Sequence, residues 1–327
     1  MSWQLKKRRR FLGLACVLAL AAGVAALHAQ NRQTLYLLAF DKKGFAVTDI
    51  KTTDLQFQEK VLEKELPGTV VSVEPFKWPL KVTVLVDNGV GAVGGTDGFD
   101  NLTQYRAGLK AFFKTLPPDL EVTLIATAPN PRYLVRPTTD EVQILKGVDL
   151  LSPENEAYGR FTESMEEYAA RLDAEFKRLT KEERQPYIPV LVVIGTTGQD
   201  GGRIEPTRAT KMVESLRNYG TWTNFIMVSA PPSSQPENEG GTVLIAKAVQ
   251  ETTGGSYFPL AGSSATRVTT LLPELAQKIA ARHLKQTLQY RVTLERPEGA
   301  TGPMGPFGIG LMREGVSYMI SANGAYP

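Results

Sequence analysis

Residues 81–87, Lys-Val-Thr-Val-Leu-Val-Asp, decide the fold of this chain. The run is almost continuously apolar, rich in β-branched side chains, and ends in a carboxylate. This pattern is typical of a strand buried on both faces, as found in parallel sheets that are covered by helices. It therefore predicts that residues 81–87 form a central strand of an α/β sheet.

Strand-like and helix-like segments alternate on the carboxyl side of this strand. Apolar residues at helical spacing predict helices, and short apolar runs predict strands. The helices are expected at 101–116, 140–151, 162–179, 205–219, 242–253 and 265–283, and the strands at 120–126, 188–194, 222–228, 256–259 and 287–294. The alternation predicts a doubly wound α/β domain over 79–295, with a mainly parallel sheet between helix layers.

The segments on either side of this domain have a different character. Residues 30–78 hold short alternating stretches separated by turn residues, which predicts a small N-terminal β unit. Residues 296–327 are rich in Gly and Pro. They predict a C-terminal tail with an edge strand near 308–312 or 316–320.

The amino end of the chain resembles an export signal. Five consecutive cations, Lys6 to Arg10, precede an apolar run over 11–27, and Ala29 supplies a small residue for cleavage. This order predicts a signal peptide over 1–29 and a secreted or periplasmic protein. An uncleaved membrane anchor and lipidation at Cys16 are the alternatives, and an uncleaved leader would be the only contact with a membrane.

Loss of the leader changes the charge and the chemistry of the chain. Removing its five basic residues from the 37 Lys and Arg leaves 32, against 34 Asp and Glu. The mature chain would be weakly acidic, which argues against a nucleic-acid partner. It would hold no Cys and a single His, His283. With so few nucleophiles and bases, the sequence predicts a protein that is not an enzyme.

Four short motifs, taken in order, resemble a known family. They are DKKGFAV at 41–47, TDLQF at 53–57, TGGSYF at 253–258 and QYRV at 289–292. The set is similar to secreted bacterial proteins of the acidobacterial type that carry a von Willebrand factor type A (VWFA) related domain. The resemblance implies a doubly wound domain that binds proteins or acts as a scaffold.

The VWFA family also implies a metal-ion-dependent adhesion site, from which this chain departs. The family places Asp-x-Ser-x-Ser after the first strand and Thr-Asp-Gly after a later one. Here Asp87 is kept, Gly89 and Gly91 replace both serines, and Thr197 replaces the aspartate. Because Mg²⁺ prefers several hard oxygen ligands, we expect a degenerate site without a cofactor, at which only Asp87 is left to hold Mg²⁺ or Mn²⁺.

Ligands of open α/β sheets lie beyond the carboxyl ends of the strands. Glycine-rich loops at that edge can let a partner's backbone approach closely. The expected partner is an extracytoplasmic protein, and two alternatives stay open: a cation-dependent adhesion module using Asp87, and an enzyme using Asp87, Asp97 and Asp200. The candidate ligand-binding rim comprises Asp87, Asn88, Gly89, Gly91, Thr196, Thr197 and Asp200.

Overall fold

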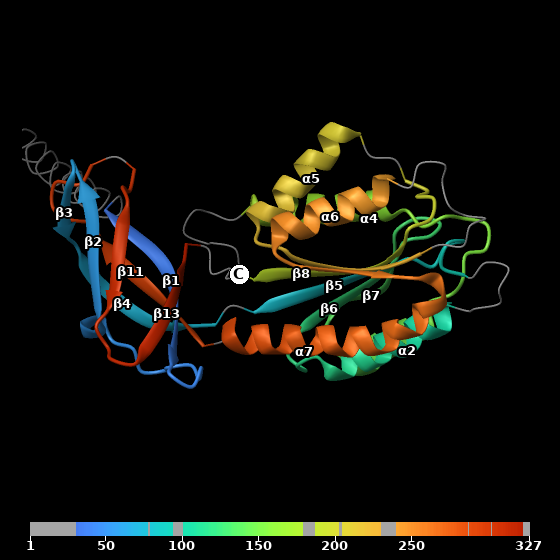
Figure 1. Ribbon diagram of the computed structural model, residues 1–327, viewed down its shortest axis with the longest axis horizontal. Coiled ribbons are helices and arrows are strands. Elements are labelled where there is room, and N and C mark those ends of the chain that lie inside the picture. Colours follow the sequence, from blue (N-terminus) through green and yellow to red (C-terminus); the bar gives the residue numbers. More distant parts are fainter. Residues whose placement is uncertain are drawn as a thin grey trace, which may run out of the picture. The chain divides into compact units, whose positions relative to one another are not determined.

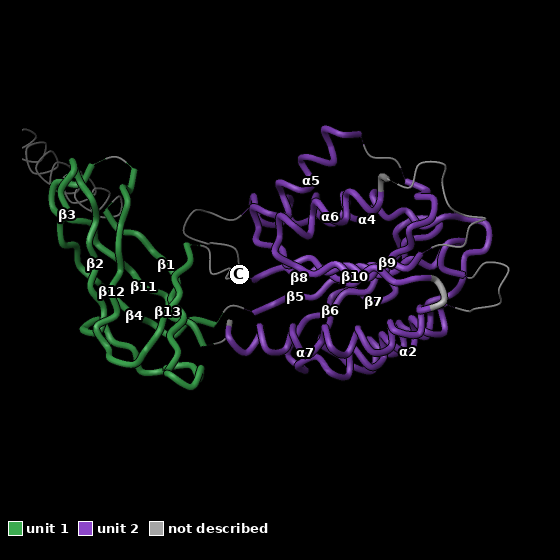
Figure 2. The backbone as a smooth tube through the Cα atoms, in the orientation of Figure 1, with its two compact units in different colours: residues 1–77, 288–326 green, residues 78–287, 327 purple. Residues whose placement is uncertain are grey.

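The computed structural model divides the chain into two units (Figure 2). Unit 1 comprises Met1–Lys77 and Leu288–Tyr326, and unit 2 comprises Trp78–Thr287. The predicted leader and Cys16 lie outside the described residues. Within the described part of the chain, no helix has the length and apolar character needed to cross a bilayer. The structure describes residues 31–77, 79–93, 101–178, 187–202, 205–229, 240–286, 288–301 and 303–322.

Unit 2 contains a six-stranded sheet in the order β10-β9-β8-β5-β6-β7. All neighbouring pairs are parallel except β6 and β7, which are antiparallel. The predicted central strand is β5, which pairs with β8 on one side and β6 on the other. The bounds are β5 (Leu80–Val86), β6 (Glu121–Ala126), β7 (Arg132–Thr138), β8 (Ile188–Thr196), β9 (Trp222–Val228) and β10 (Ser256–Leu260).

Helices cover both faces of this sheet, as Figure 1 shows. α4, α5 and α6 lie on one face, and α2 and α7 lie on the other. The apolar stripe of α4 packs Met165, Leu172 and Phe176 against the sheet core. This architecture confirms the predicted doubly wound α/β fold. The bounds are α2 (Asn101–Thr115), α3 (Glu141–Asp149), α4 (Phe161–Phe176), α5 (Pro206–Asn218), α6 (Gly240–Thr253), η3 (Gly262–Arg267) and α7 (Val268–Gln286).

Unit 1 is built from two antiparallel sheets, in the orders β13-β1-β11-β4 and β12-β2-β3. Their apolar faces share one core, in which Leu37, Phe57, Val292 and Ile309 are buried. The bounds are β1 (Arg32–Asp41), η1 (Thr52–Asp54), β2 (Leu55–Val61), β3 (Lys64–Pro67), β4 (Thr69–Phe76), β11 (Gln289–Glu295), β12 (Phe307–Leu311) and β13 (Val316–Ser321).

The carboxyl-terminal strands belong to unit 1. β11 was expected in the α/β domain, but it pairs with β1 and β4. Its alternating burial fits an antiparallel sheet with one covered face, unlike the continuous burial of β8. The expected tail supplies β12 and β13, so an edge strand forms at each of the two predicted places. Unit 2 is therefore inserted between β4 and β11, two neighbouring strands of unit 1.

A buried ion pair joins β2 to the segment after β11. Arg296 donates from Nε to Glu59 Oε2 over 2.9 Å and from Nη2 to Glu59 Oε1 over 2.6 Å. The Gly305 N–H donates to the same carboxylate over 2.9 Å. The side chains of Arg296 and Glu59 are only 4% and 0% exposed. The pair therefore fixes the chain after β11 inside unit 1.

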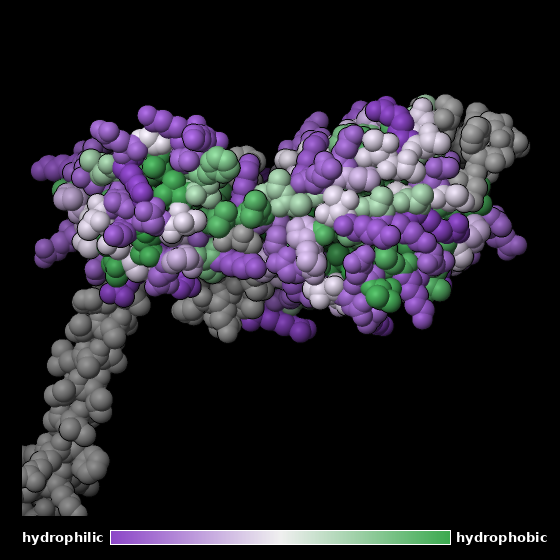
Figure 3. Space-filling model, turned by 90° about the horizontal axis from the view of Figure 1, so that it is seen from below, coloured by the Kyte–Doolittle hydropathy of each residue, from purple (hydrophilic) through white to green (hydrophobic). Residues whose placement is uncertain are grey.

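The surface is mixed in character. In Figure 3, hydrophobic side chains on the face shown are interspersed with hydrophilic ones over the described residues of both units. Scattered apolar side chains of this kind are ordinary on a protein surface. This face does not by itself mark an interaction site.

Candidate functional site

The ends of β5 and β8 bring Asp87 and Thr196 together. The two strands are parallel neighbours with Val86 opposite Ile194, so their carboxyl ends emerge at the same edge of the sheet. The Thr196 hydroxyl donates to Asp87 Oδ2 over 2.6 Å. The Gly89 N–H donates to Asp87 Oδ1 over 2.8 Å. Both carboxylate oxygens of Asp87 are therefore bonded to donors of the chain itself.

Burial governs the electrostatics of Asp87, whose residue is 8% exposed. Removal from water raises the pKa of its carboxyl group above the ordinary value. The hydrogen bonds from Thr196 and Gly89 oppose this shift, and the negative charge of Asp200 adds to it. Asp87 is thus an internal acceptor at the end of β5, with little access to solvent.

Asn88 connects three loops beneath the rim. It is fully buried, and its amide donates to the Ser152 carbonyl over 2.9 Å. Its side-chain oxygen accepts from the Ala128 N–H over 2.9 Å. These bonds tie the loop after β5 to the loop after β6 and to the segment before α4. Asn88 therefore positions loops.

Gly89 and Gly91 are both buried, and they face the chain itself. A Cβ atom added at Gly89 would lie 2.5 Å from the Gly159 nitrogen and 2.6 Å from the Ala157 carbonyl oxygen. One added at Gly91 would lie 2.6 Å from Thr196 Oγ1. The sequence predicts that a partner's backbone approaches these glycines closely. In the structure, the chain's own residues occupy that space instead.

Thr197 and Asp200 are half-buried and lie nearer the surface. The Thr197 N–H donates to the Val228 carbonyl over 2.9 Å, which holds the start of its loop against the end of β9. Asp200 accepts from the N–H groups of Phe161 and Thr162 over 2.9 and 3.0 Å. Its charge therefore satisfies two unpaired donors at the amino end of α4 and complements the helix dipole there.

The residues at this edge do not fit the family's metal site. Gly89 and Gly91 offer no side-chain oxygens, Thr197 offers no carboxylate, and both Asp87 oxygens already accept hydrogen bonds. The hydroxyl of Thr127 is buried there and has no hydrogen-bond partner in the part of the chain that the structure describes, but one hydroxyl adds little to an octahedral set. Among the described residues, no group of three His, Cys, Asp or Glu side chains could hold a metal ion.

The proposed acidic trio of Asp87, Asp97 and Asp200 is only partly defined. Asp97 lies outside the described residues. Asp87 and Asp200 are near enough for the charge of Asp200 to raise the pKa of Asp87, yet each accepts hydrogen bonds from the chain. The one histidine beyond the leader, His283, lies on α7 and contacts Asp119 through Nε2 at 3.1 Å. It is therefore engaged outside the rim.

No family model matches the sequence, and no curated protein matches it. Among solved structures, the conserved hypothetical protein BatB from Bacteroides thetaiotaomicron is similar over 63% of this chain and 99% of its own, with 13% identity and a TM-score of 0.45. A von Willebrand factor type A structure from Catenulispora acidiphila is similar over 84% of this chain and 68% of its own, with 9% identity and a TM-score of 0.46. The vWF domain of the type V pili tip protein Mfa5 from Porphyromonas gingivalis is similar over 63% of this chain and 97% of its own, with 11% identity and a TM-score of 0.42.

Proposed function

We propose that this chain is a VWFA-like module that binds a protein, or acts as a scaffold for one, outside the cytoplasm and without a metal ion. One observation carries the proposal: the Asp87 carboxylate is buried, and its two oxygens accept hydrogen bonds from Thr196 and Gly89. Loops that are held together in this way need no ion to organise them. The predicted leader supports an extracytoplasmic location.

The binding surface we assign is the accessible part of the rim. Gln199 and Gly201 are exposed, and Asp200 and Arg160 are half-buried beside them. Arg160 pairs with Glu163 at 2.7 Å, and both side chains keep more than a third of their surface in water. This mixed-charge patch suits a protein partner, since rim charges guide association. Gly89 packs against the loop over 157–159, which precedes Arg160, and Gly91 packs against Thr196.

Gln199→Arg is expected to weaken capture of the partner at least tenfold while leaving stability unchanged. The substitution adds bulk and charge at an exposed position of the rim. Gln143→Arg is the matched control, because Gln143 is also exposed but lies in the first turn of α3, after β7. Pull-downs from the envelope and medium of the native organism measure partner capture by both variants. Equal capture by the two variants, or no partner captured by the parent chain, would count against the rim.

Millimolar Mg²⁺, Mn²⁺ or Ca²⁺ is expected to produce no binding heat and no shift in Tm. Asp87→Asn should be about as stable as the parent, because an amide oxygen can still accept from Gly89. Asp87→Ala should lose about 1–3 kcal/mol, since it leaves two buried donors unsatisfied. Calorimetry and thermal denaturation measure these effects.

An ion-induced stabilisation that disappears in Asp87→Asn would reject metal independence and favour a cation-dependent adhesion module. A stabilisation that persists in both Asp87 variants would place the ion elsewhere on the chain. These two results are distinguishable because Asp87→Asn removes the negative charge of the carboxylate but keeps its planar shape and one acceptor oxygen.

A further inference from the structure

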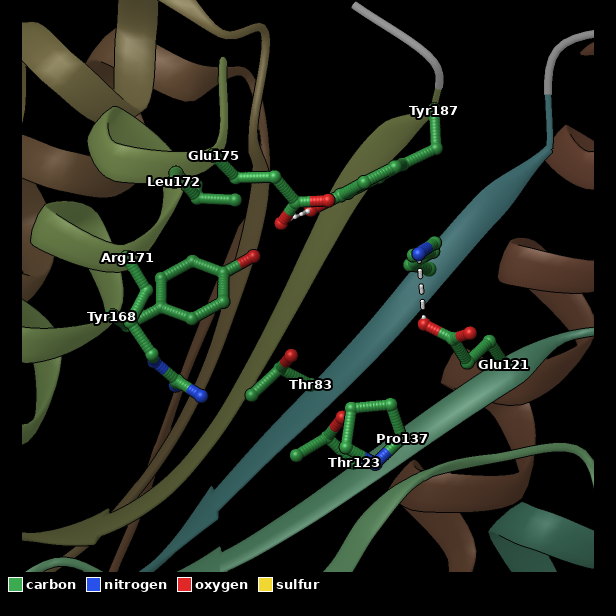
Figure 4. A pocket seen from close by; sticks show the side chains of 10 residues that line it. Thr83, Glu121, Thr123, Pro137, Tyr168, Arg171, Leu172, Glu175 and Tyr187 are labelled. Atoms are coloured by element: carbon green, nitrogen blue, oxygen red, sulfur yellow. Dashed lines mark hydrogen bonds and ion pairs between the residues drawn. The ribbon is translucent and has the colours of Figure 1, made fainter. Parts of the chain in front are cut away.

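A cavity lies in unit 2, away from the rim. Its volume is about 290 Å³, and it is lined by residues of the sheet and of α4. Lys81 and Glu121, near the amino ends of β5 and β6, stand at its border. Figure 4 shows the side chains of α4 reaching toward the strands. The cavity therefore opens at the sheet edge opposite the one that carries Asp87.

Most charges around this cavity are paired. Lys81 Nζ lies 3.0 Å from Glu121 Oε1 and 4.3 Å from the centre of the Tyr187 ring. The Tyr187 hydroxyl donates to Glu175 Oε2 over 2.7 Å, and this hydrogen bond is drawn in Figure 4. These contacts account for one cation and two carboxylates of the lining.

Arg171 is the exception. Its Nη1 donates to the Tyr133 hydroxyl, and its guanidinium lies 5.2 Å from the Tyr133 ring and 5.8 Å from the Tyr168 ring. Its Nε is buried and has no hydrogen-bond partner among the described residues. No carboxylate of the described chain forms an ion pair with it. Burial lowers the pKa of Arg171, and electrostatic interactions with Tyr187 and Glu175 oppose this shift.

We propose that this cavity binds a small organic anion whose carboxylate pairs with the Arg171 guanidinium. The planar fork of an arginine matches a carboxylate in two parallel hydrogen bonds. The buried hydroxyls of Thr83 and Thr123 line the strand side, and Tyr168 and Leu172 offer apolar surface to the body of the ligand. A volume of about 290 Å³ suits a molecule the size of a single ring. This site is independent of the proposed protein-binding rim.

Benzoate tests the site, because it joins one carboxylate to one flat apolar ring. In isothermal titration of the full chain, benzoate should bind, and neutral benzamide of the same shape should bind at least tenfold more weakly. Arg171→Gln should lower benzoate affinity at least tenfold. Arg178→Gln is the matched control, since Arg178 is exposed and follows α4 two turns beyond Arg171. It should leave benzoate affinity unchanged.

Inorganic phosphate forms a further arm of the experiment. Binding of phosphate but not benzoate would overturn the carboxylate ligand. Equal binding of benzoate and benzamide by the parent chain would overturn the role of charge, and this comparison does not depend on any variant folding. Equal loss of benzoate binding in Arg171→Gln and Arg178→Gln would overturn the assignment to Arg171.

Discussion

Arg296→Ala is expected to lower the free energy of unfolding of unit 1 by about 3–5 kcal/mol. The substitution leaves the Glu59 carboxylate in a place where its side chain is 0% exposed and without its cation. Within the described ranges, the Gly305 N–H is the donor that would remain on that carboxylate. Breaking a buried pair from one side is costly because the remaining charge cannot regain water. Urea denaturation followed by the fluorescence of the full chain measures the loss.

Arg291→Ala is the matched control for this result. Arg291 lies on β11 and pairs with Glu74 of β4, but both side chains are about half exposed. Removing Arg291 leaves the Glu74 carboxylate in contact with water, so the effect should be far smaller. The double variant Glu59→Leu/Arg296→Met should recover most of the stability, because it removes both charges together. A loss in Arg296→Ala no greater than that in Arg291→Ala would contradict the buried pair's role.

The buried pair of Glu59 and Arg296 makes the stability of unit 1 depend on pH. Its hydrogen bonds with Arg296 hold the pKa of Glu59 below the ordinary value of 4.5. The folded chain therefore releases this proton more readily than the unfolded chain. The stabilisation is fully present above about pH 4.5 and is lost as the pH falls through the lower folded pKa. In Glu59→Leu/Arg296→Met, unit 1 should lose less stability over this acid range than the parent does.

The sheet of unit 2 could be predicted because each inner strand carries its own signal. β5, β8 and β9 are mostly apolar, and every residue of β8 and β9 is buried. A strand covered on both faces needs no distant information to be recognised. The helices between these strands follow from apolar spacing in the same local way. The doubly wound architecture thus rests on patterns of fewer than twenty residues.

Unit 1 could not be predicted as one body because its contacts join the two ends of the chain. The Ile50 N–H donates to the Tyr290 hydroxyl over 3.2 Å, and that hydroxyl donates to the Val47 carbonyl over 3.0 Å. Nothing local to Tyr290 reveals a partner 240 residues away. Its strand follows a helix, so the strand–helix alternation appeared to continue. β11 pairs with β1 and β4, which lie far away in the sequence, and no short sequence pattern indicates this pairing.

The sequence indicates which residues lie at this edge of the sheet, but it does not indicate how deeply they are buried. Asp87 and Thr196 meet, as the carboxyl ends of neighbouring parallel strands require. No local pattern indicates that the loop around Gly159 packs against Asp87, because that loop belongs to a different connection. Arg171 escaped notice for a similar reason. It borders the apolar stripe of α4, where a cation usually reaches solvent, and only the packed structure shows that Arg171 is half-buried with its Nε atom covered.

Gly89→Ala is expected to lower the stability of unit 2 by about 3 kcal/mol, the upper part of the range for inserting a methyl group into packed structure. The new Cβ would lie 2.5 Å from the Gly159 nitrogen, 2.6 Å from the Ala157 carbonyl oxygen and 2.8 Å from the Tyr158 carbonyl carbon. These are backbone atoms and cannot rotate away. The loop over 157–159 must therefore shift, and with it the Val90 N–H bond to Ala157, which is 2.8 Å long.

Two further glycines calibrate this effect in the same denaturation experiment. Gly91→Ala should cost less than Gly89→Ala, since its nearest contact is the Thr196 hydroxyl, a side-chain group that can move. Gly310→Ala should cost nothing or stabilise slightly, because a Cβ there meets no atom within 4 Å and alanine restricts the unfolded chain. If Gly89→Ala instead kept the parent's stability but lost partner capture, Gly89 would be open to the partner, and the closed loop described here would not be the binding state.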